Sequence, residues 1–252
     1  MSFNDKVVIV TGSSSGIGAA IAIKLAEHGA KVVLVGRNQK KLDQVARKCN
    51  NPLVITAEVT KQEDVKRIIN DTVKHFGKLD ILINNAGISN PSSILDDNAI
   101  ETFKQTMATN LNAVVHLTHL AAPHIIKTKG NIINISSIAS MRVTAFLGFA
   151  YNTSKAAVDH FTRSVASELA SSGVRVNSVN PGPVKTDIVE NMGKTKVEEE
   201  AFWAGVKTQT GLNRVSDPEE IADLVLFLAS DKAKGITGSA FVSDNGALIK
   251  SN

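Results

Sequence analysis

Short apolar runs rich in valine and isoleucine alternate with longer amphipathic segments along this chain. A strand buried on both faces is predicted for each of these runs: KVVIVT, KVVLVG, PLVITAEV, LDILINN, NIINIS, VRVNSVN and GSAFVSD. Between them, apolar spacing predicts helices over 16–29, through Cys49, over 63–77, from about 99 to 127, from about 150 to 171, and over 217–230. Asp217 is suited to cap the last helix and Pro218 to its first turn, whereas 181–216 is predicted to be loop-rich.

The alternation of strands and helices predicts the arrangement of the whole chain. Helical crossovers between consecutive strands favour a parallel sheet with helices on both faces. No internal repeat and no low-complexity linker divides the sequence. We therefore expect an α/β protein with one doubly wound parallel sheet, in a single domain that spans residues 1–252.

The composition argues against several other classes of protein. Hydrophobic residues make up 43% of the 252 residues and charged residues 21%, which is ordinary for a globular protein. The net charge of +4 comes with scattered lysines, so we expect a solvated basic surface and no nucleic-acid partner. Cys49 is the only cysteine, so no intrachain disulfide can form, and no apolar run is long enough to span a membrane. The chain enters its first strand with no room for a signal peptide, and a cytoplasmic location is expected.

A glycine-rich segment, TGSSSGIG at 11–18, joins the first predicted strand to the first helix. Gly12 permits a tight turn, Gly16 lets the backbone approach a pyrophosphate, and Gly18 lets the helix pack against the strand. Backbone amides at the start of the helix then bind the phosphates. A tight turn without a ligand is the alternative, but the strand before and the helix after favour a dinucleotide cofactor.

Tyr151 is the only tyrosine in the chain, and Lys155 follows it at a spacing that shares one helix face. A free tyrosine titrates near pH ~10, which is too high for efficient acid–base work at neutral pH. A nearby ammonium favours the phenolate and lowers this pKa, so the pair is suited to proton transfer during carbonyl reduction. A structural tyrosine beside a solvated lysine is the alternative interpretation.

Further motifs follow in a specific order: NNAG at 84–87, Asn110, NISS at 134–137, YNTSK at 151–155 and NPGPVKT at 180–186. Together with TGSSSGIG, they make the chain resemble the short-chain dehydrogenase/reductase family over nearly its whole length. The resemblance implies a Rossmann-like, doubly wound fold and interconversion of a ketone and a secondary alcohol by hydride transfer. It also implies that Tyr151 is the general acid/base and that Lys155 binds the nicotinamide ribose. Ser137 would bond the substrate oxygen, and Asn110 would hold a water in a proton relay.

By the same resemblance, residues at the ends of the strands are expected to hold the nicotinamide cofactor. They are Gly12, Ser14, Ser15, Gly16, Ile17, Gly18, Arg37, Glu58, Val59, Asn85, Ala86, Gly87, Tyr151, Lys155, Pro181, Gly182, Val184 and Thr186. Val184 and Thr186 would contact the carboxamide, while Ala86 and Gly87 would line the path of the adenosine. Glu58 stands where the family usually has an aspartate that contacts the adenine.

The position of the serine departs from the family pattern. Ser137 lies fourteen residues before Tyr151, whereas thirteen is the commoner spacing in the family. The segment between them is therefore expected to contain one extra residue. Ser136 and Ser140 are possible alternatives to Ser137, although the motif NISS favours Ser137.

The end of the second predicted strand bears on the choice of cofactor. An acidic residue is expected about 20 positions after the glycine-rich turn in proteins that bind NAD, where it holds the ribose. This chain has Gly36 there, which removes the repulsion of a phosphate, and then Arg37, whose planar guanidinium matches phosphate oxygens. We therefore expect NADP(H); the alternative is that Arg37 merely caps a turn at the surface.

Large apolar side chains are expected to border the substrate. Those proposed for the pocket beside Ser137 are Met141, Phe149, Met192, Phe202 and Trp203, with Phe146 in the same region. Such a lining favours a lipophilic ketone or secondary alcohol, and a 3-oxoacyl thioester is the alternative. By resemblance, about 187–212 would form a substrate lid; otherwise it is a helix packed for stability or a subunit contact.

Three histidines, His116, His119 and His124, fall on one predicted helix. Positions three apart share a helix face, so a pair of metal ligands is conceivable. No carboxylate or cysteine accompanies them at ligand spacing, so surface or packing histidines are favoured and no metal site is expected.

The function predicted from these features is that of an NADP(H)-dependent oxidoreductase acting on a small-molecule ketone or alcohol. A 3-oxoacyl thioester reductase is the nearest alternative, because the same catalytic set could serve it. A cofactor-binding regulator without catalysis is a different alternative, and the intact pair of Tyr151 and Lys155 argues against it. Homotetramers are common in the family and are expected here.

Overall fold

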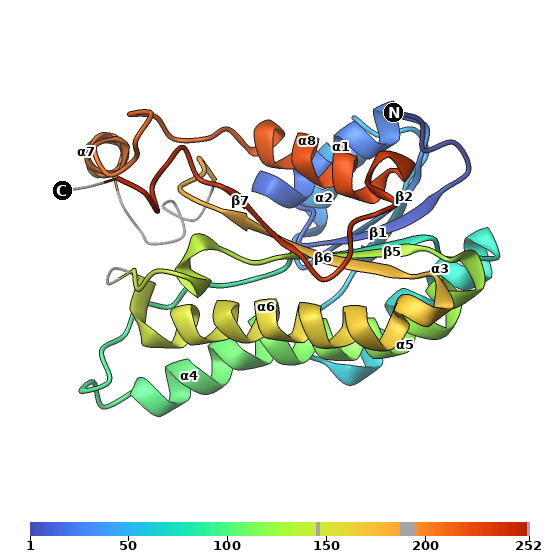
Figure 1. Ribbon diagram of the computed structural model, residues 1–252, viewed down its shortest axis with the longest axis horizontal. Helices are drawn as coiled ribbons and strands as arrows, with labels where there is room; N and C mark the ends of the chain where they lie inside the picture. The colour runs from blue at the N-terminus through green and yellow to red at the C-terminus, as the bar shows by residue number, and fades with distance from the viewer. Residues whose placement is uncertain (145–146, 187–194, 251–252) are drawn as a thin grey trace.

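Seven parallel strands form one sheet in the computed structural model, which describes residues 1–144, 147–186 and 195–250 (Figure 1). The strands are β1 (Val7–Thr11), β2 (Lys31–Gly36), β3 (Leu53–Thr56), β4 (Ile81–Asn84), β5 (Asn131–Ile135), β6 (Arg175–Pro181) and β7 (Ala240–Ser243). Their order across the sheet is β3-β2-β1-β4-β5-β6-β7, and every neighbouring pair is parallel. The predicted doubly wound parallel sheet is therefore confirmed.

Helices cover both faces of the sheet (Figure 1). One face carries α1 (Gly16–Glu27), α2 (Gln39–Ala46) and α8 (Pro218–Ala229). The other carries α3 (Gln62–Phe76), α4 (Ala99–Met107), α5 (Ala113–Thr128) and α6 (Gly148–Leu169). α7 (Lys196–Lys207) lies at one end of the molecule. Within the described ranges, no helix is long and apolar enough to cross a membrane.

Successive side chains of a strand point into different layers of the core. In β1, Val8 and Val10 pack with residues of α1 and α8, whereas Val7 and Ile9 pack with residues of α3 and α5. All four are fully buried, because a central parallel strand has a helical layer on each side. This double burial explains why the strands appear in the sequence as continuous apolar runs.

Two predicted helices differ from the structure in detail. The helix predicted from 99 to 127 is interrupted by a π-helical turn at Ala108–Asn112, which separates α4 from α5. The second helix ends at Ala46 and does not run through Cys49. Beyond Arg47 the amides of Lys48 and Cys49 bond carbonyls three residues back, and such tight turns do not continue an α-helix.

The prediction that 181–216 is loop-rich is wrong for part of that segment, because it contains α7. A capping box fixes the start of α7: the Glu198 carboxylate accepts from the Thr195 amide, and the Glu198 amide donates back to Thr195 Oγ1. α8 begins at Pro218 directly after Asp217, as predicted.

The order of the strands places two loops side by side. From β1 the chain continues to β2 and β3 on one side of the sheet, and then returns to build β4 through β7 on the other side. In doubly wound sheets, ligands bind outside the carboxyl ends of the strands at such a switch point. The glycine-rich turn follows β1 and the NNAG motif ends β4, so both lie at this position.

Candidate active site

The turn after β1 has the geometry of a phosphate cradle. Gly12 and Gly16 have φ angles of +64° and +54°, a conformation that side chains disfavour. A Cβ atom at Gly12 would lie 2.9 Å from the Cα of Ala86, and one at Gly16 would lie 3.1 Å from the Cγ2 of Thr186. α1 begins directly after Ser15 with no acidic residue in its first turn, so its N-terminal amides suit an anion. A cradle that a single Cβ would fill fits the pyrophosphate of a dinucleotide.

The NNAG motif supports this cradle from the end of β4. Nδ2 of Asn85 donates to the carbonyl oxygens of Thr11 and Gly12, at 2.9 and 3.2 Å. The backbone amides of Asn85 and Ala86 both donate to Oγ1 of Thr11. A Cβ at Gly18 would overlap the Gly12 carbonyl oxygen and Nδ2 of Asn85. Gly18 therefore packs against the turn itself as well as bringing the helix close to the strand.

Tyr151, Ser137 and Lys155 come together between the carboxyl end of β5 and the start of α6. Ser137 follows β5 and shares a side-chain hydrogen bond with Tyr151 on the first turn of α6. Nζ of Lys155, one turn later, lies 5.5 Å from the centroid of the Tyr151 ring. The same Nζ donates to the carbonyl oxygen of Ile135 at 2.8 Å, and Lys155 is 5% exposed. The four-residue spacing thus sets an ammonium beside the phenol.

The three serines near β5 differ in what their hydroxyls contact. Ser136 donates to the carbonyl oxygen of Lys155 at 3.2 Å, and Ser140 donates to that of Ser137 at 2.8 Å. The Ser137 side chain bonds Tyr151 and accepts from the amide of Ala139. Of the three, Ser137 is the one that the structure places against the tyrosine.

Burial acts on both titratable groups of this centre. Burial raises the pKa of Tyr151, and the hydrogen bond with Ser137 opposes this rise. Burial lowers the pKa of Lys155 to about 8, and the negative charge of Asp159 opposes this fall. At neutral pH, therefore, Tyr151 holds its proton and Lys155 is mostly an ammonium.

Asn110 lies in the π-helical turn between α4 and α5 and is 1% exposed. Its Oδ1 accepts from the amide of Ile88 at 2.8 Å, and its Nδ2 donates to the Ile88 carbonyl at 2.9 Å and to Ser154 Oγ at 3.0 Å. The side chain thereby joins the segment after NNAG to α6, next to Lys155. π turns are frequent at functional sites. The role of holding a relay water stays a prediction.

Arg37 and Glu58, which were expected to contact different parts of the cofactor, lie against each other. Nη1 of Arg37 is 3.5 Å from Oε2 of Glu58. The Arg37 side chain is 71% exposed, so its guanidinium remains accessible to a phosphate. A Cβ atom at Gly36 would lie 3.4 Å from Ser14. The space beside Gly36, next to Arg37, is therefore narrow but not filled. A phosphate at this position would compete with the Glu58 carboxylate for the guanidinium of Arg37. The sequence did not reveal this competition.

The remaining predicted cofactor residues lie on the same edge of the sheet. Val184 is 7% exposed and forms a parallel bridge with Ser216, which anchors the segment after β6. A Cβ at Gly87 would lie 3.6 Å from Nζ of Lys155, so the NNAG motif reaches the reaction centre. The others lie at or just after the ends of strands, or at the start of α1: Ser14, Ser15, Ile17, Val59, Pro181 and Gly182.

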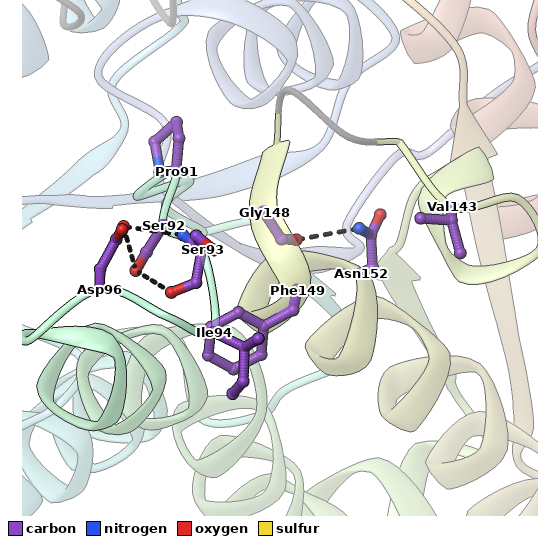
Figure 2. A pocket seen from close by; sticks show the side chains of 9 residues that line it. All are labelled: Pro91, Ser92, Ser93, Ile94, Asp96, Val143, Gly148, Phe149 and Asn152. Atoms are coloured by element: carbon purple, nitrogen blue, oxygen red, sulfur yellow. Dashed lines mark hydrogen bonds between the residues drawn. The ribbon is translucent and has the colours of Figure 1, made fainter.

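A cavity of about 550 Å³ opens beside the first turn of α6 (Figure 2). Its lining combines the segment after β4 with the start of α6: Pro91, Ser92, Ser93, Ile94, Asp96, Val143, Gly148, Phe149 and Asn152. Phe149, which was predicted to border the substrate, lines this cavity. Met141, Phe202 and Trp203, which were predicted with it, are described by the structure but lie outside this lining.

The predicted lid at 187–212 is described from residue 195 onward, and α7 forms most of that part. Phe202 and Trp203 meet edge to face, with ring centroids 5.1 Å apart. Nε1 of Trp203 donates to Glu199 one turn earlier, at 3.3 Å. Met192 and Phe146 fall outside the described residues.

Asp159, which the sequence did not single out, and Asn180, the first residue of the NPGPVKT motif, are tied closely to the reaction centre. Asp159 on α6 is 6% exposed, and Asn180 on β6 is fully buried. Nδ2 of Asn180 donates to Asp159 at 2.7 Å and to the carbonyl oxygen of Ser137 at 3.1 Å. Asp159 follows Lys155 by one helical turn, as Lys155 follows Tyr151, so all three lie on one helix face. The same spacing in the sequence could therefore have pointed to Asp159.

The fold and the site together define an oxidoreductase that uses a nicotinamide cofactor and acts on an alcohol or carbonyl group, and comparison with known proteins supports this class. Residues 12–247 match the family model described as enoyl-(acyl carrier protein) reductase. The chain belongs to the short-chain dehydrogenase/reductase family, as its motifs predicted.

Several relatives match almost the whole chain. Short-chain dehydrogenase/reductase FrzI of Cladobotryum sp is 38% identical, over 97% of this chain and 96% of its own. L-fucose dehydrogenase of Bos taurus is 34% identical, over 97% of this chain and 90% of its own. Meso-2,3-butanediol dehydrogenase of Serratia marcescens is 32% identical, over 98% and 96%. A crystal structure of a family member of unknown function from Caenorhabditis elegans, with cofactor, is similar with a TM-score of 0.93 at 35% identity, covering 99% of this chain and 97% of its own.

Proposed function

We propose that this protein is an NADP(H)-dependent oxidoreductase that interconverts a ketone and a secondary alcohol, with Tyr151 as the general acid/base. The observation that supports this proposal is the set of contacts around one phenol. Tyr151 has a hydrogen bond with Ser137, and Nζ of Lys155 is 5.5 Å from its ring. The glycine-rich cradle for a dinucleotide lies at the same edge of the sheet.

In the direction of reduction, Tyr151 gives its proton to the carbonyl oxygen. The cofactor supplies the hydride when it is bound in the cradle. Ser137 orients the substrate oxygen and stabilises the phenolate that remains on Tyr151. Lys155 provides a positive charge next to that phenolate, and Asn110 holds the surrounding segments in place. General acid–base help of this kind contributes about 10²–10⁴-fold to a rate. In oxidation the phenolate takes the proton from the alcohol.

The protonation states support reduction at neutral pH. Because burial raises the pKa of Tyr151, the phenol keeps its proton until the substrate oxygen can accept it. Lys155 loses its charge as pH rises through about 8. Reduction is therefore expected to decline above that pH, because the phenolate formed by proton transfer loses its positively charged neighbour.

The preference for NADP(H) is proposed on the basis of Arg37 and Gly36. The guanidinium is 71% exposed at the end of β2, where the adenosine ribose binds in doubly wound folds. Gly36 carries no carboxylate that would repel a phosphate. Glu58 pairs with Arg37 at 3.5 Å and reduces this preference without abolishing it, since an exposed ion pair is weak.

We propose a lipophilic ketone or secondary alcohol as the substrate. Beside the cavity, the Ser92 hydroxyl and the Ser93 amide both donate to the Asp96 carboxylate (Figure 2). These polar groups satisfy one another, so the surface left for a substrate is mainly that of Ile94 and Val143, which are 65% and 81% exposed.

Two other substrate classes are kept as alternatives. The names of L-fucose dehydrogenase and meso-2,3-butanediol dehydrogenase favour a hydroxylated substrate. The description of the family model, enoyl-(acyl carrier protein) reductase, names an acyl thioester, and a 3-oxoacyl thioester is the member of that class with a ketone for Tyr151 to protonate. Both would use the same Tyr151 and Lys155.

The test measures turnover of the wild type and of Tyr151→Phe with NADPH and with NADH, against lipophilic ketones, a vicinal diol, a sugar and a 3-oxoacyl thioester. We expect NADPH to be consumed with a lipophilic ketone, and Tyr151→Phe to lose about 10²-fold or more of the rate. Calorimetry should give the same Kd for NADPH in both proteins. Ser136→Ala is the control, since its hydroxyl bonds a backbone carbonyl and not the tyrosine.

Two outcomes would overturn the proposal. If Tyr151→Phe kept more than about a tenth of the wild-type rate, Tyr151 would not be the acid. If the wild type bound cofactor but turned over none of these substrates, a regulator without catalysis would be favoured.

We also propose that the protein is a homotetramer in the cytoplasm. This proposal is carried by the family resemblance, in which long helices such as α6 build the subunit contacts. Light scattering of the full chain tests the assembly, and a mass equal to that of one chain would overturn it.

A further inference from the structure

Asp159 is a buried carboxylate on the helix that carries Tyr151 and Lys155. It lies in α6, one turn after Lys155, and is 6% exposed. Its Oδ1 accepts from Ser178 Oγ at 2.9 Å, and its Oδ2 accepts from Asn180 Nδ2 at 2.7 Å. Both donors belong to β6, so the carboxylate ties α6 to the sheet.

Asn180 extends this connection to the loop that carries Ser137. Besides Asp159, its Nδ2 lies 3.1 Å from the carbonyl oxygen of Ser137 and 3.0 Å from Ser140 Oγ. An amide nitrogen carries two hydrogens, so three acceptors share them and the short bond to the carboxylate orients the group. Asp159 thereby fixes the amide that holds the backbone of Ser137.

The charge of Asp159 acts on Lys155. Nζ of Lys155 donates to the carbonyl oxygen of Ile135, a neutral acceptor that cannot balance an ammonium. Asp159 follows Lys155 by four residues, a spacing that brings two helical side chains together. Both groups are buried, so their interaction is only weakly screened by solvent.

We propose that Asp159 is a positioning residue of the reaction centre, which holds Ser137 in place through Asn180 and keeps Lys155 protonated. This inference builds on the proposed function, because it assumes that Tyr151, Ser137 and Lys155 carry out the proton transfer. Asp159 itself does not touch the substrate oxygen in this scheme. Its effect on the reaction passes through Lys155 and through the loop of Ser137.

The groups that face Asp159 set the direction of the expected pH effect. Within the described residues, the titratable groups on its face of α6 are Lys155 and Tyr151 on one side and Arg163 on the other, and the Arg163 guanidinium is exposed and contacts His160. The residues of the packed elements that the network contacts are neutral: Ser178, Asn180, Ser137 and Ser140. An anion raises the pKa of every neighbouring group, so removing it lowers the pKa of Lys155.

Asp159→Asn separates the charge from the hydrogen bonds. The amide oxygen can still accept from Asn180, and the amide nitrogen that takes the place of Oδ1 can donate to Ser178 Oγ instead of accepting from it. Both contacts are thus kept while the negative charge is lost. In the protein without cofactor, the pKa of Lys155 is measured by NMR of ¹³C-labelled lysine. The signal that titrates near 8, below the usual lysine range, is assigned by its absence in Lys155→Arg. We expect this midpoint to fall by about one pH unit in Asp159→Asn, since a nearby opposite charge shifts a pKa by about 1–3 units.

Two matched variants control the measurement. Glu168→Gln removes one negative charge from an exposed position of the same helix, and the Lys155 midpoint should stay in place. Ser178→Ala removes a hydrogen bond to Asp159 but keeps the carboxylate, so it should also leave the midpoint within about 0.3 units. Thermal unfolding of each variant shows that the fold is retained.

Activity provides the second readout. The high-pH limb of ketone reduction should move down with the Lys155 midpoint, giving about threefold lower turnover near pH ~7.5. A Lys155 midpoint in Asp159→Asn that equals that of the wild type would overturn the inference, whatever the activity. If instead Tyr151→Phe remained active, the proposed function would fail while the NMR result still tested Asp159.

Discussion

Replacing Arg37 by leucine is expected to remove most of the preference for NADPH. A charge-assisted hydrogen bond to a phosphate contributes roughly 1.5–3 kcal/mol, which corresponds to about 10- to 150-fold in relative affinity. The Arg37 guanidinium is now 3.5 Å from the Glu58 carboxylate, and the arginine is 71% exposed. An exposed pair of this kind contributes only about 0.2–1 kcal/mol, so a phosphate should win the competition.

The competition between a phosphate and Glu58 for Arg37 gives the opposite expectation for Glu58→Gln, which should increase the preference for NADPH. Freeing Arg37 should improve kcat/KM for NADPH by up to about fivefold and leave NADH nearly unchanged. The double change Gly36→Asp with Arg37→Leu should shift the preference strongly toward NADH. The Cβ at Gly36 would meet Leu42 at 3.3 Å, so the new side chain requires only a small adjustment of its neighbours.

The assay compares kcat/KM for NADPH and NADH with one ketone in each protein. Glu63→Gln is the control, because it removes the same charge from an exposed ion pair with Lys66 and does not involve Arg37. The reasoning is refuted if Arg37→Leu keeps the wild-type ratio of the two cofactors. If kcat/KM for NADPH rose as much in Glu63→Gln as in Glu58→Gln, the gain would be a general effect of charge and not an effect on Arg37.

The remaining predictions concern the cradle and the buried lysine. Gly12→Ala should lower the free energy of unfolding by at least about 1–2 kcal/mol and weaken cofactor binding, since φ is +64° and the Cβ would lie 2.9 Å from Ala86. Gly205→Ala, where the Cβ meets nothing within 4 Å, should stabilise α7 slightly, and equal losses in both variants would contradict this account. The folded pKa of Lys155 lies below its unfolded value, so between about 8 and 10.5 the unfolded chain binds more protons and wild-type stability rises with pH. Lys155→Met should lack this rise with pH. Near neutral pH it should be up to about 3 kcal/mol more stable than the wild type while losing activity. Denaturant unfolding at about pH 8 and about pH 10.5 measures the free energy of unfolding of both proteins.

The sequence by itself determined the sheet and the helical pair at its edge. Strands buried on both faces must be apolar throughout, so the runs around Val8 and Val33 were visible without any structure. The spacing of Tyr151 and Lys155 follows from the pitch of a helix, which is a local property. The positive φ angles of Gly12 and Gly16 are local in the same sense, whereas the close approach of Ala86 and Thr186 to these glycines is a tertiary contact.

Helix ends and interruptions were decided by tertiary contacts. The π turn at Asn110 is accompanied by two hydrogen bonds with Ile88 and one with Ser154, and none of these partners is near it in sequence. α7 could have been predicted from the capping box of Thr195 and Glu198, but its surroundings have few apolar periodic positions. Local patterns cannot report a bond whose partner is supplied by another element.

The contacts of the site also depend on which strand ends the sheet brings together. Parallel pairing of β2 with β3 sets Gly36 beside Thr56, so the residues that follow, Arg37 and Glu58, emerge side by side and form an ion pair. In the same way, β6 carries Asn180 to the loop of Ser137 and to Asp159 on α6. Such neighbours are fixed by strand order and register, which the packing of the whole core selects and no single segment encodes.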